Sequence, residues 1–101
     1  MPMIATYSVS KTALLGLAKA VSAQLSPMGI RANVVCPGII KTRFSGTIPD
    51  SFQEEFCGQV PMGRVGKPEE IGGLVTFLCS DDASYITGES FVASGGYFTR
   101  L

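Results

Sequence analysis

The chain has 101 residues, 46% of them hydrophobic and 16% charged, a balance that is typical of a globular protein with a core and allows one domain at most. Its 8 basic and 8 acidic residues cancel, and because no cluster of Lys and Arg is present, we expect neither nucleic acid nor an anionic membrane surface among its partners. The absence of histidine excludes Ser-His and Cys-His catalysis within this chain and nearly all common zinc sites, which leaves tyrosine, lysine and carboxylates as acid-base candidates.

Neither a leader nor a membrane span is expected. Residues 1–6 lack the basic region and the sustained apolar core of a secretory signal, and the longest apolar runs are far too short to cross a bilayer. Cys36, Cys57 and Cys79 are odd in number and form no Cys-x-x-Cys pair, so we expect ordinary thiols in a reducing compartment, with Cys36 buried. The sequence therefore predicts a soluble, intracellular protein.

A long helix is predicted from Thr6 or Ser8, either of which can cap its first turn, to about Leu25. Near its start, Tyr7 and Lys11 are four residues apart and so lie one turn from each other on the same face. An ammonium group beside a phenol lowers the phenol's pKa from its ordinary value of about 10, which suits Tyr7 to general acid-base catalysis with Lys11 as its partner. The alternative is that this common spacing arises by chance.

The same helix is apolar on two faces. One face continues the line of Tyr7 and Lys11 as a core-facing stripe that contains Leu14, Ala18, Val21 and Leu25. The other face consists mainly of small residues, namely Val9, Ala13, Gly16, Leu17, Ala20 and Ala23. Because small side chains let a neighbouring helix approach closely, we predict the interface of a homo-oligomer there. The alternative is a helix buried wholly within one larger subunit.

A strand is predicted over residues 30–36, which are rich in β-branched side chains and are bounded by Gly29 and by Pro37-Gly38. The continuous apolar run 34–36 is typical of a parallel strand that is covered on both faces. In open α/β sheets, ligands bind just beyond the carboxyl ends of the strands, and residues 37–42 occupy that place. Gly38 would let the backbone approach a ligand closely, and Thr42 offers a hydroxyl; the alternative is a plain turn.

Residues 43–67 show little periodicity apart from a short helical stretch at 51–56. An irregular segment of this length is usually a lid, a binding loop or disordered, and we interpret it as a flap on the substrate side. Its apolar residues could close over a nonpolar substrate or only pack the segment down; they are Phe44, Phe52, Phe56, Val60 and Met62. Glu54 and Glu55 are adjacent and point in different directions, so we interpret them as solvated helix surface.

Pro68-Glu69-Glu70 predicts the start of a second helix, which ends at residues 80–82, and a second strand is predicted over 90–94. Two such strands joined by a crossover helix form a βαβ unit of a parallel sheet. The predicted fold class is α/β, in the order helix, strand, flap, helix, strand. Because a parallel sheet needs more than two strands, residues 1–101 are expected to be the C-terminal portion of one Rossmann-like doubly wound domain whose opening half is absent.

Taken together, these motifs resemble the C-terminal portion of a classical short-chain dehydrogenase/reductase. The matching segments are, in chain order, 7–11 with the family's Tyr-x-x-x-Lys, 30–38, Thr42, 64–71, 84–89 and Gly95-Gly96. Within the family, residues 11–17, 85–88 and 99–101 look most like the NADP(H)-dependent carbonyl and retinal reductases of the dehydrogenase/reductase member-4 type.

The resemblance implies an oxidoreductase that transfers hydride between NADP(H) and a carbonyl or alcohol substrate, such as a ketone, a dicarbonyl or a retinal-like compound, without a metal. Tyr7 would donate a proton to the carbonyl oxygen or accept one from the alcohol, and Lys11 would lower the tyrosine pKa and bind the nicotinamide ribose. The nicotinamide carboxamide would be held by Pro37, Gly38, Ile40 and Thr42. NAD(H) stays open, because the residue that separates the two cofactors falls in the family's N-terminal half.

That N-terminal half, with the Gly-rich turn for the cofactor pyrophosphate and the catalytic serine, has no counterpart in these residues. We therefore expect this chain by itself to bind a nicotinamide cofactor weakly or not at all. A smaller departure is Ser94, where many relatives have aspartate, and it is expected to affect local packing only.

Two further expectations concern the biology of the chain. The alternative to an enzyme is a truncated, inactive product that associates with an intact family member through its long helix. Residues 99–101, Thr-Arg-Leu, are similar to the Ser-Lys-Leu peroxisomal address, although threonine is a poor match, so we expect a cytoplasmic or peroxisomal protein.

Overall fold

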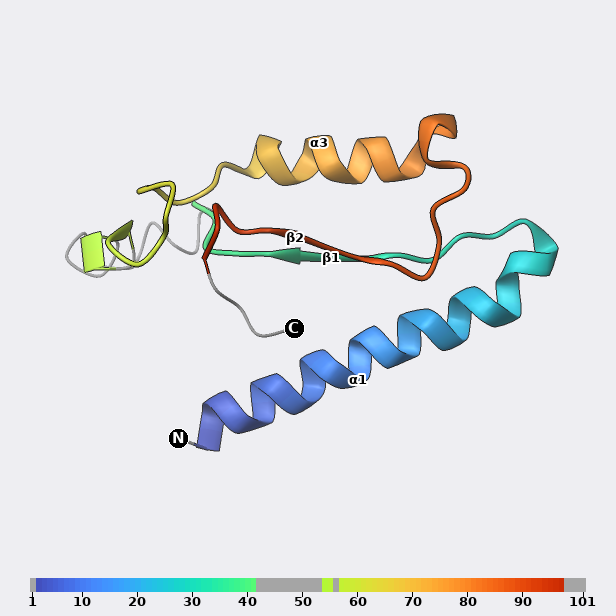
Figure 1. Ribbon diagram of the computed structural model, residues 1–101, viewed down its shortest axis with the longest axis horizontal. Coiled ribbons are helices and arrows are strands. Elements are labelled where there is room, and N and C mark those ends of the chain that lie inside the picture. The colour runs from blue at the N-terminus through green and yellow to red at the C-terminus, as the bar shows by residue number, and fades with distance from the viewer. Residues whose placement is uncertain (1, 42–53, 56, 98–101) are drawn as a thin grey trace.

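The computed structural model describes residues 2–41, 54–55 and 57–97, with the backbone alone for residues 2–8. Helix α1 (Pro2–Leu25) and helix α3 (Pro68–Cys79) lie on opposite sides of a small sheet formed by strand β1 (Val34–Pro37) and strand β2 (Ser90–Ala93), as Figure 1 shows. Short 3₁₀ turns, η1 (Ser26–Met28) and η3 (Asp81–Ala83), follow the two helices. The predicted α/β fold class is confirmed.

The two strands are parallel, and their register pairs Val34 with Ser90 at one end and Pro37 with Ala93 at the other. The pairing continues one step beyond the strands, because Gly38 N–H donates to Ala93 O at 2.9 Å. Helix α3 lies between β1 and β2 in the chain and crosses over one face, so the predicted βαβ unit is confirmed.

Helix α1 begins at Pro2, earlier than the predicted start at Thr6 or Ser8, with proline at its first position. It ends at Leu25, as predicted. Gly29 has φ 75°, and this left-handed residue lets Ile30 N–H donate back to Leu25 O at 3.2 Å, which closes the helix end.

Strand β1 begins later than the predicted 30–36 and extends to Pro37. Residues 31–33 join the chain before β2 through one backbone bond, from Gly88 N–H to Ala32 O at 2.7 Å, and otherwise through side chains. The Arg31 guanidinium donates to three carbonyl oxygens, those of Leu78 at 2.7 Å, Ile86 at 3.1 Å and Ser80 at 3.4 Å. One cation therefore ties the end of α3 and the chain before β2 to the start of β1.

Thr87 and Asn33 complete this arrangement. Thr87 Oγ1 accepts a hydrogen bond from Ala32 N–H at 3.1 Å and lies 2.7 Å from the buried Ser22 Oγ of α1. The Asn33 side chain donates to Ile86 O at 3.1 Å and accepts from Glu89 N–H at 3.1 Å. We call Arg31, Asn33 and Thr87 the amino-end cluster, since they lie where both strands begin.

The buried apolar side chains of the described residues are few, and they lie on β1, on α3 and in the segments that flank α3. They are Val34, Cys36, Val60, Leu78 and Ala83. The buried position of Cys36 is as predicted, and Cys36, Cys57 and Cys79 are all free thiols.

Helix α1 is only partly covered. Its sheet-facing line runs through the half-buried Lys11, Leu15 and Ala18 to the buried Ser22. Leu14, predicted on the core-facing stripe, is 50% exposed, so that prediction is wrong. The helix is rotated so that Leu15 takes the inward position and Leu14 falls at the edge of the stripe.

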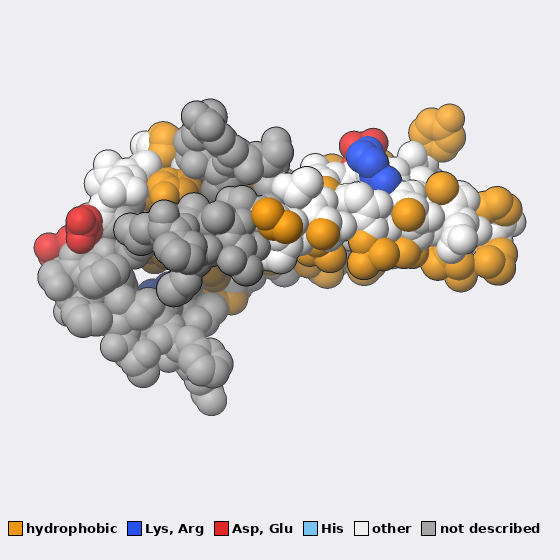
Figure 2. Space-filling model, turned by 90° about the horizontal axis from the view of Figure 1, so that it is seen from below, with side chains coloured by type: hydrophobic (Ala, Val, Ile, Leu, Met, Phe, Trp, Pro, Cys, Tyr) orange, Lys and Arg blue, Asp and Glu red, His pale blue; other side chains and the backbone are white. Residues whose placement is uncertain are grey.

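The predicted small-residue face of α1 is exposed along its whole length, with Val9 at 70% and Leu17 at 58%. Figure 2 shows hydrophobic side chains gathered on this side of the molecule. The radius of gyration is 15.6 Å, compared with about 13 Å for a compact domain of this length, so the chain is extended for its size. Among the described residues, no helix is both long and apolar enough to cross a bilayer.

Candidate active site

The predicted site residues come from two elements that reach the same end of the molecule. Strands β1 and β2 both run toward the end at which α1 begins (Figure 1). Tyr7 and Lys11 both lie in α1, so their predicted helical spacing of one turn is present, and Lys11 is half-buried. The Tyr7 side chain and the whole of Thr42 fall outside the described part, so the meeting of phenol, ammonium and hydroxyl stays a prediction.

Of the other predicted residues, Pro37 is the last residue of β1, and Gly38 and Ile40 lie just after it. Three backbone hydrogen bonds hold this loop, which we call the β1 loop (residues 38–41). Gly38 N–H donates to Ala93 O at 2.9 Å, Gly66 N–H donates to Ile39 O at 2.8 Å, and Lys41 N–H donates to Gly66 O at 2.9 Å. The last two form a parallel bridge between Ile40 and Gly66.

Gly38 is required by the protein itself. A Cβ on Gly38 would lie 2.8 Å from both Cα and Cβ of Ser94, a distance that side chains do not tolerate. The sequence had suggested that this glycine allows close approach to a ligand or a plain turn. In the structure, the partner that approaches closely is the residue directly after β2.

Ile40 presents its backbone polar groups away from that bridge. Because Gly66 bonds to the carbonyl of Ile39 and the N–H of Lys41, the N–H and C=O of Ile40 point to the opposite side. Within residues 2–41, 54–55 and 57–97, neither group has a hydrogen-bond partner. The β1 loop therefore presents one donor and one acceptor side by side, which is the complement of a primary carboxamide.

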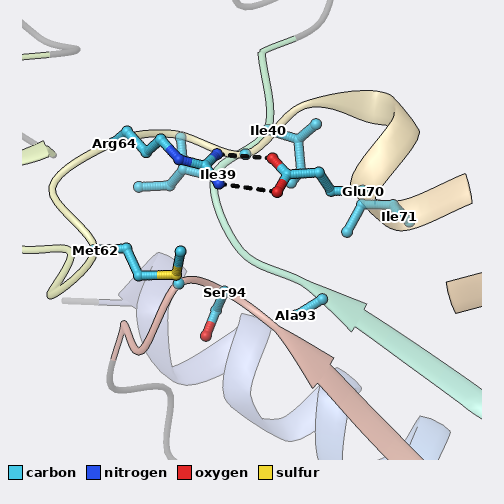
Figure 3. Close-up of a pocket in the computed structure, with 10 residues that line it drawn as sticks. Ile39, Ile40, Met62, Arg64, Glu70, Ile71, Ala93 and Ser94 are labelled. Carbon is cyan, nitrogen blue, oxygen red and sulfur yellow. Dashed lines mark hydrogen bonds and ion pairs between the residues drawn. The ribbon is translucent and has the colours of Figure 1, made fainter. Parts of the chain in front are cut away.

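A pocket of about 220 Å³ lies beside the β1 loop, at the carboxyl ends of both strands (Figure 3). It is lined by Ile39, Ile40, Met62, Arg64, Gly66, Glu70, Ile71, Ala93, Ser94 and Gly95. Its walls are mainly apolar, with one charged side. Met62, predicted as an apolar flap residue, lines this pocket, whereas Phe44, Phe52 and Phe56 lie outside the described residues.

The flap is fastened to the end of β2 over its described part. Met62 N–H donates to Gly95 O at 3.1 Å. Val60 is 5% exposed, and a Cβ on Gly95 would lie 2.9 Å from Val60 Cγ1. The Gly95-Gly96 pair, with φ 64° and 87°, is thus needed both for its left-handed backbone and for this close packing.

The charged side of the pocket is an ion pair that the sequence analysis did not single out. Arg64 donates through both terminal nitrogens to Glu70, at 2.7 and 2.9 Å. Glu70 also accepts from Lys67 N–H at 3.0 Å, which caps α3. The hydrogen bond from Arg64, followed by that from Lys67, lowers the pKa of Glu70 from 4.5 to about 2. A basic residue six positions before an acid at the third position of a predicted helix was the available signal.

With this fold and this loop, the chain belongs to the short-chain dehydrogenase/reductase family of oxidoreductases. The sequence model described as Enoyl-(Acyl carrier protein) reductase matches residues 1–98, which is nearly the whole chain. The predicted membership of the family is confirmed.

Individual relatives agree with this assignment. The chain is similar to dehydrogenase/reductase SDR family member 4 of Mus musculus, with 50% identity over 102 residues that cover 99% of this chain and 37% of the relative. The protein of the same name in Homo sapiens is 49% identical over the same shares. The chain thus spans a little over a third of the length of these relatives.

Solved structures give the same result. The 3-oxoacyl-[acyl-carrier protein] reductase of Brucella melitensis superposes with a TM-score of 0.86 at 31% identity, covering 93% of this chain and 35% of that one. YwfH, an NADPH dependent reductase involved in bacilysin biosynthesis, superposes with a TM-score of 0.82 at 36% identity, covering 93% and 40%.

Proposed function

We propose that this chain is the portion of an NADP(H)-dependent oxidoreductase that supplies the catalytic tyrosine and lysine, and that the enzyme interconverts a carbonyl compound and its alcohol. The observation that carries the proposal is the pair of outward-facing backbone groups on Ile40, at the end of the molecule where α1 begins. A nicotinamide ring carries a carboxamide that matches this pair. When bound, the cofactor supplies the hydride chemistry.

The chain's own residues would bind, orient and exchange a proton. Ile40 would donate its N–H to the carboxamide oxygen and accept from the carboxamide nitrogen, while Pro37 and Gly38 fix the loop and Thr42 adds a hydroxyl. Tyr7 would give a proton to the substrate carbonyl oxygen, or take one from the alcohol. Lys11 would favour the phenolate form of Tyr7 and bind the ribose hydroxyls.

The proposed substrate and cofactor types rest on the pocket lining and on one structural neighbour. The apolar side chains around the pocket beside the β1 loop suit a ketone, a dicarbonyl or a retinal-like compound. One structural neighbour is described as an NADPH dependent reductase, which supports NADP(H) over NAD(H). Comparing the two cofactors at equal concentration in the assay below decides between them.

The test uses a chimera in which this chain replaces the segment that it matches in the mouse relative. We expect NADPH-dependent reduction of a diketone, and we expect Tyr7→Phe to lower turnover by about a hundredfold or more, because the proton donor is lost. Tyr85→Phe is the matched control, since Tyr85 is fully exposed. Full turnover of the Tyr7→Phe chimera would refute the proposal.

The exposed small-residue face of α1 supports a second candidate, namely association with another copy of the chain or with an intact relative, with or without catalysis. Light scattering of the chain should then give a dimer or tetramer mass. Leu17→Glu, in the middle of this face, should reduce the mass to that of a monomer. Met28→Glu, equally exposed but beyond the helix, should not.

For the location of the protein, we propose the cytoplasm or the peroxisome. The support is the similarity of residues 99–101 to the Ser-Lys-Leu address alone. A fluorescent reporter fused to the last dozen residues tests the peroxisomal part. If Thr-Arg-Leu acts as a peroxisomal address, we expect a punctate signal that overlaps a peroxisomal marker. A diffuse signal would instead support a cytoplasmic location.

A further inference from the structure

We propose that the Arg64–Glu70 ion pair positions the β1 loop, by holding Gly66 in the place from which it bonds to Ile39 and Lys41. Arg64 and Glu70 are thus positioning residues, which act through Gly66 on the direction of the Ile40 backbone groups. This effect of the ion pair on the β1 loop does not require a bound ligand. Its consequence for cofactor binding rests on the function proposed above.

Residues 64–70 form a closed ring of hydrogen bonds. Glu70 accepts from both terminal nitrogens of Arg64 and from Lys67 N–H, Glu70 N–H donates to Lys67 O at 2.9 Å, and Arg64 donates to Val65 O at 3.2 Å. A two-point contact between guanidinium and carboxylate fixes orientation as well as distance. The ring therefore restricts Gly66, which lies within it between Val65 and Lys67.

Gly66 is bonded to the β1 loop on both sides of Ile40. It donates to Ile39 O at 2.8 Å and accepts from Lys41 N–H at 2.9 Å. The fit is close, because a Cβ on Gly66 would lie 2.6 Å from Ile40 Cδ1. A shift of Gly66 would therefore move the peptide groups of the loop.

The β1 loop has few other hydrogen bonds to the described residues. In the described part of the chain, the only other hydrogen bond to residues 38–41 is the one from Gly38 to Ala93 O. Figure 3 shows the Arg64 and Glu70 side chains facing each other, with two dashed bonds between them, near Ile39 and Ile40. All four residues line the same pocket, so the ion pair lies beside the β1 loop.

Exposure of the pair argues for a local role. The side chains of Arg64 and Glu70 are 45% and 44% exposed, and exposed ion pairs contribute little to global stability. A contribution to the stability of the whole chain would therefore be small. To hold the β1 loop in place, the hydrogen-bonded ring of residues 64–70 needs only to resist local opening.

The test measures amide hydrogen exchange of this chain by NMR. Arg64→Gln removes the guanidinium group that donates two hydrogen bonds to Glu70. Glu70→Gln removes the negative charge of the carboxylate, while an amide oxygen stays available to cap α3. In both variants, the amides of Gly66 and Lys41 should exchange about fivefold faster or more. The amides of Val34 and Gly88, which donate at the opposite end of the strands, should be unchanged. Glu69→Gln is the control for loss of one acidic charge next to Glu70.

Two combined variants sharpen the test. If the residues act as a pair, Arg64→Gln with Glu70→Gln should exchange no faster than the worse single variant. The reversed pair, Arg64→Glu with Glu70→Arg, should recover part of the protection. Unchanged exchange at Gly66 and Lys41, or an equal rise at Val34, would overturn the proposal, since the pair would then either hold nothing or stabilise the chain as a whole.

The consequence for binding is measured separately in the chimera. Arg64→Gln should raise KM for NADPH with a smaller change in kcat, because the loop that receives the carboxamide is displaced. Faster exchange with an unchanged KM would support the coupling and refute the binding role of the β1 loop. Failure of the positioning proposal and failure of the proposed function are therefore distinguishable.

Discussion

The two ends of the strand pair are built differently. Where the strands begin, the amino-end cluster ties side chains to backbone: Arg31 reaches three carbonyl groups, and Asn33 and Thr87 each take two partners. Where the strands end, the loops are held by single backbone bonds and by one exposed ion pair. Among the described residues, one end has its polar groups bonded internally, and the other has a donor and an acceptor on Ile40 that find no partner there.

This difference separates stability from binding. Side-chain hydrogen bonds to the backbone fix the amino end without leaving groups for a ligand, whereas a binding loop must keep unsatisfied groups and so gains less from its own contacts. We therefore expect substitutions at the amino end to lower the stability of the whole chain. Substitutions at the carboxyl end should act on the loops and cost less.

The largest effect is expected for Arg31→Ala. It removes a charged donor from the carbonyls of Leu78 and Ile86, both at 3.1 Å or less, and from the more distant Ser80. Hydrogen bonds to charged groups are the stronger ones, so the free energy of unfolding should fall by about 3 kcal/mol. The measurement is the urea midpoint at constant slope.

Lys19→Ala is the control for this prediction, because Lys19 is an exposed cation with a single 3.3 Å bond to Gly88 O. It should change the unfolding free energy by about 0.5 kcal/mol or less. If both variants lost the same unfolding free energy, Arg31 of the amino-end cluster would stabilise the chain no more than an exposed cation does.

The next effect is expected for Gly38→Ala, at the carboxyl end. The new methyl group would lie 2.8 Å from Ser94 Cα, and backbone must move to relieve the overlap, so we expect a loss of about 2 kcal/mol in the unfolding free energy. Gly16→Ala is the matched control in α1, where no atom lies within 4 Å of the added Cβ. That variant should be more stable by about 0.5 to 1 kcal/mol, and a loss there would contradict the expected helix geometry.

Much of this fold could be predicted from the sequence because its elements carry local signals. The apolar run 34–36, the Pro68 helix start and the glycines at 95–96 located β1, α3 and the end of β2 within a few residues. The prediction that the strand begins at residue 30 and not at Val34 could not be corrected from the sequence. The Arg31 and Asn33 side chains bond to the backbone of Leu78 and Ile86, and the backbone of Ala32 bonds to Thr87 and Gly88. Such contacts depend on residues more than 40 positions away.

The site was predictable in part, for the same reason. Spacing on a helix placed Tyr7 and Lys11 one turn apart, and the rule for parallel sheets placed Pro37, Gly38 and Ile40 at a strand end. The role of Gly38 was not predictable, because its close neighbour is Ser94, far along the chain. The rotation of α1 that exposes Leu14 was missed because a stripe defined by sequence is wider than the line that contacts the sheet.

A smaller effect is expected for Gly66→Ala. The added Cβ meets Ile40 Cδ1, the end of a flexible side chain that can turn aside, so the loss should be about 1 kcal/mol in the unfolding free energy. Ile40→Val removes that methyl group. The double variant should therefore lose less than the sum of the two single losses in a urea-denaturation cycle. Additive losses would show that the two residues do not touch in solution.

The smallest effect, and the one that separates the two ends most directly, is the pH dependence of the Glu70 pair. Folding lowers the pKa of Glu70 from 4.5 to about 2, first because Arg64 donates to it, so its stabilising contribution is present above about pH 4.5. It is lost as the pH falls toward about 2, where the folded state also binds the proton.

The urea midpoint of the unmodified chain should accordingly exceed that of Glu70→Gln at neutral pH, and the two should converge as the pH falls through this range. In an Arg64→Gln background the convergence should be weaker, since the largest cause of the lowered pKa is gone. The amino-end cluster should behave differently, because Arg31 is held by carbonyl oxygens that do not titrate. The loss of unfolding free energy in Arg31→Ala should therefore be nearly the same at neutral pH and at acidic pH. An equal pH dependence of the two losses, at the amino end and at the carboxyl end, would contradict the distinction between the ends.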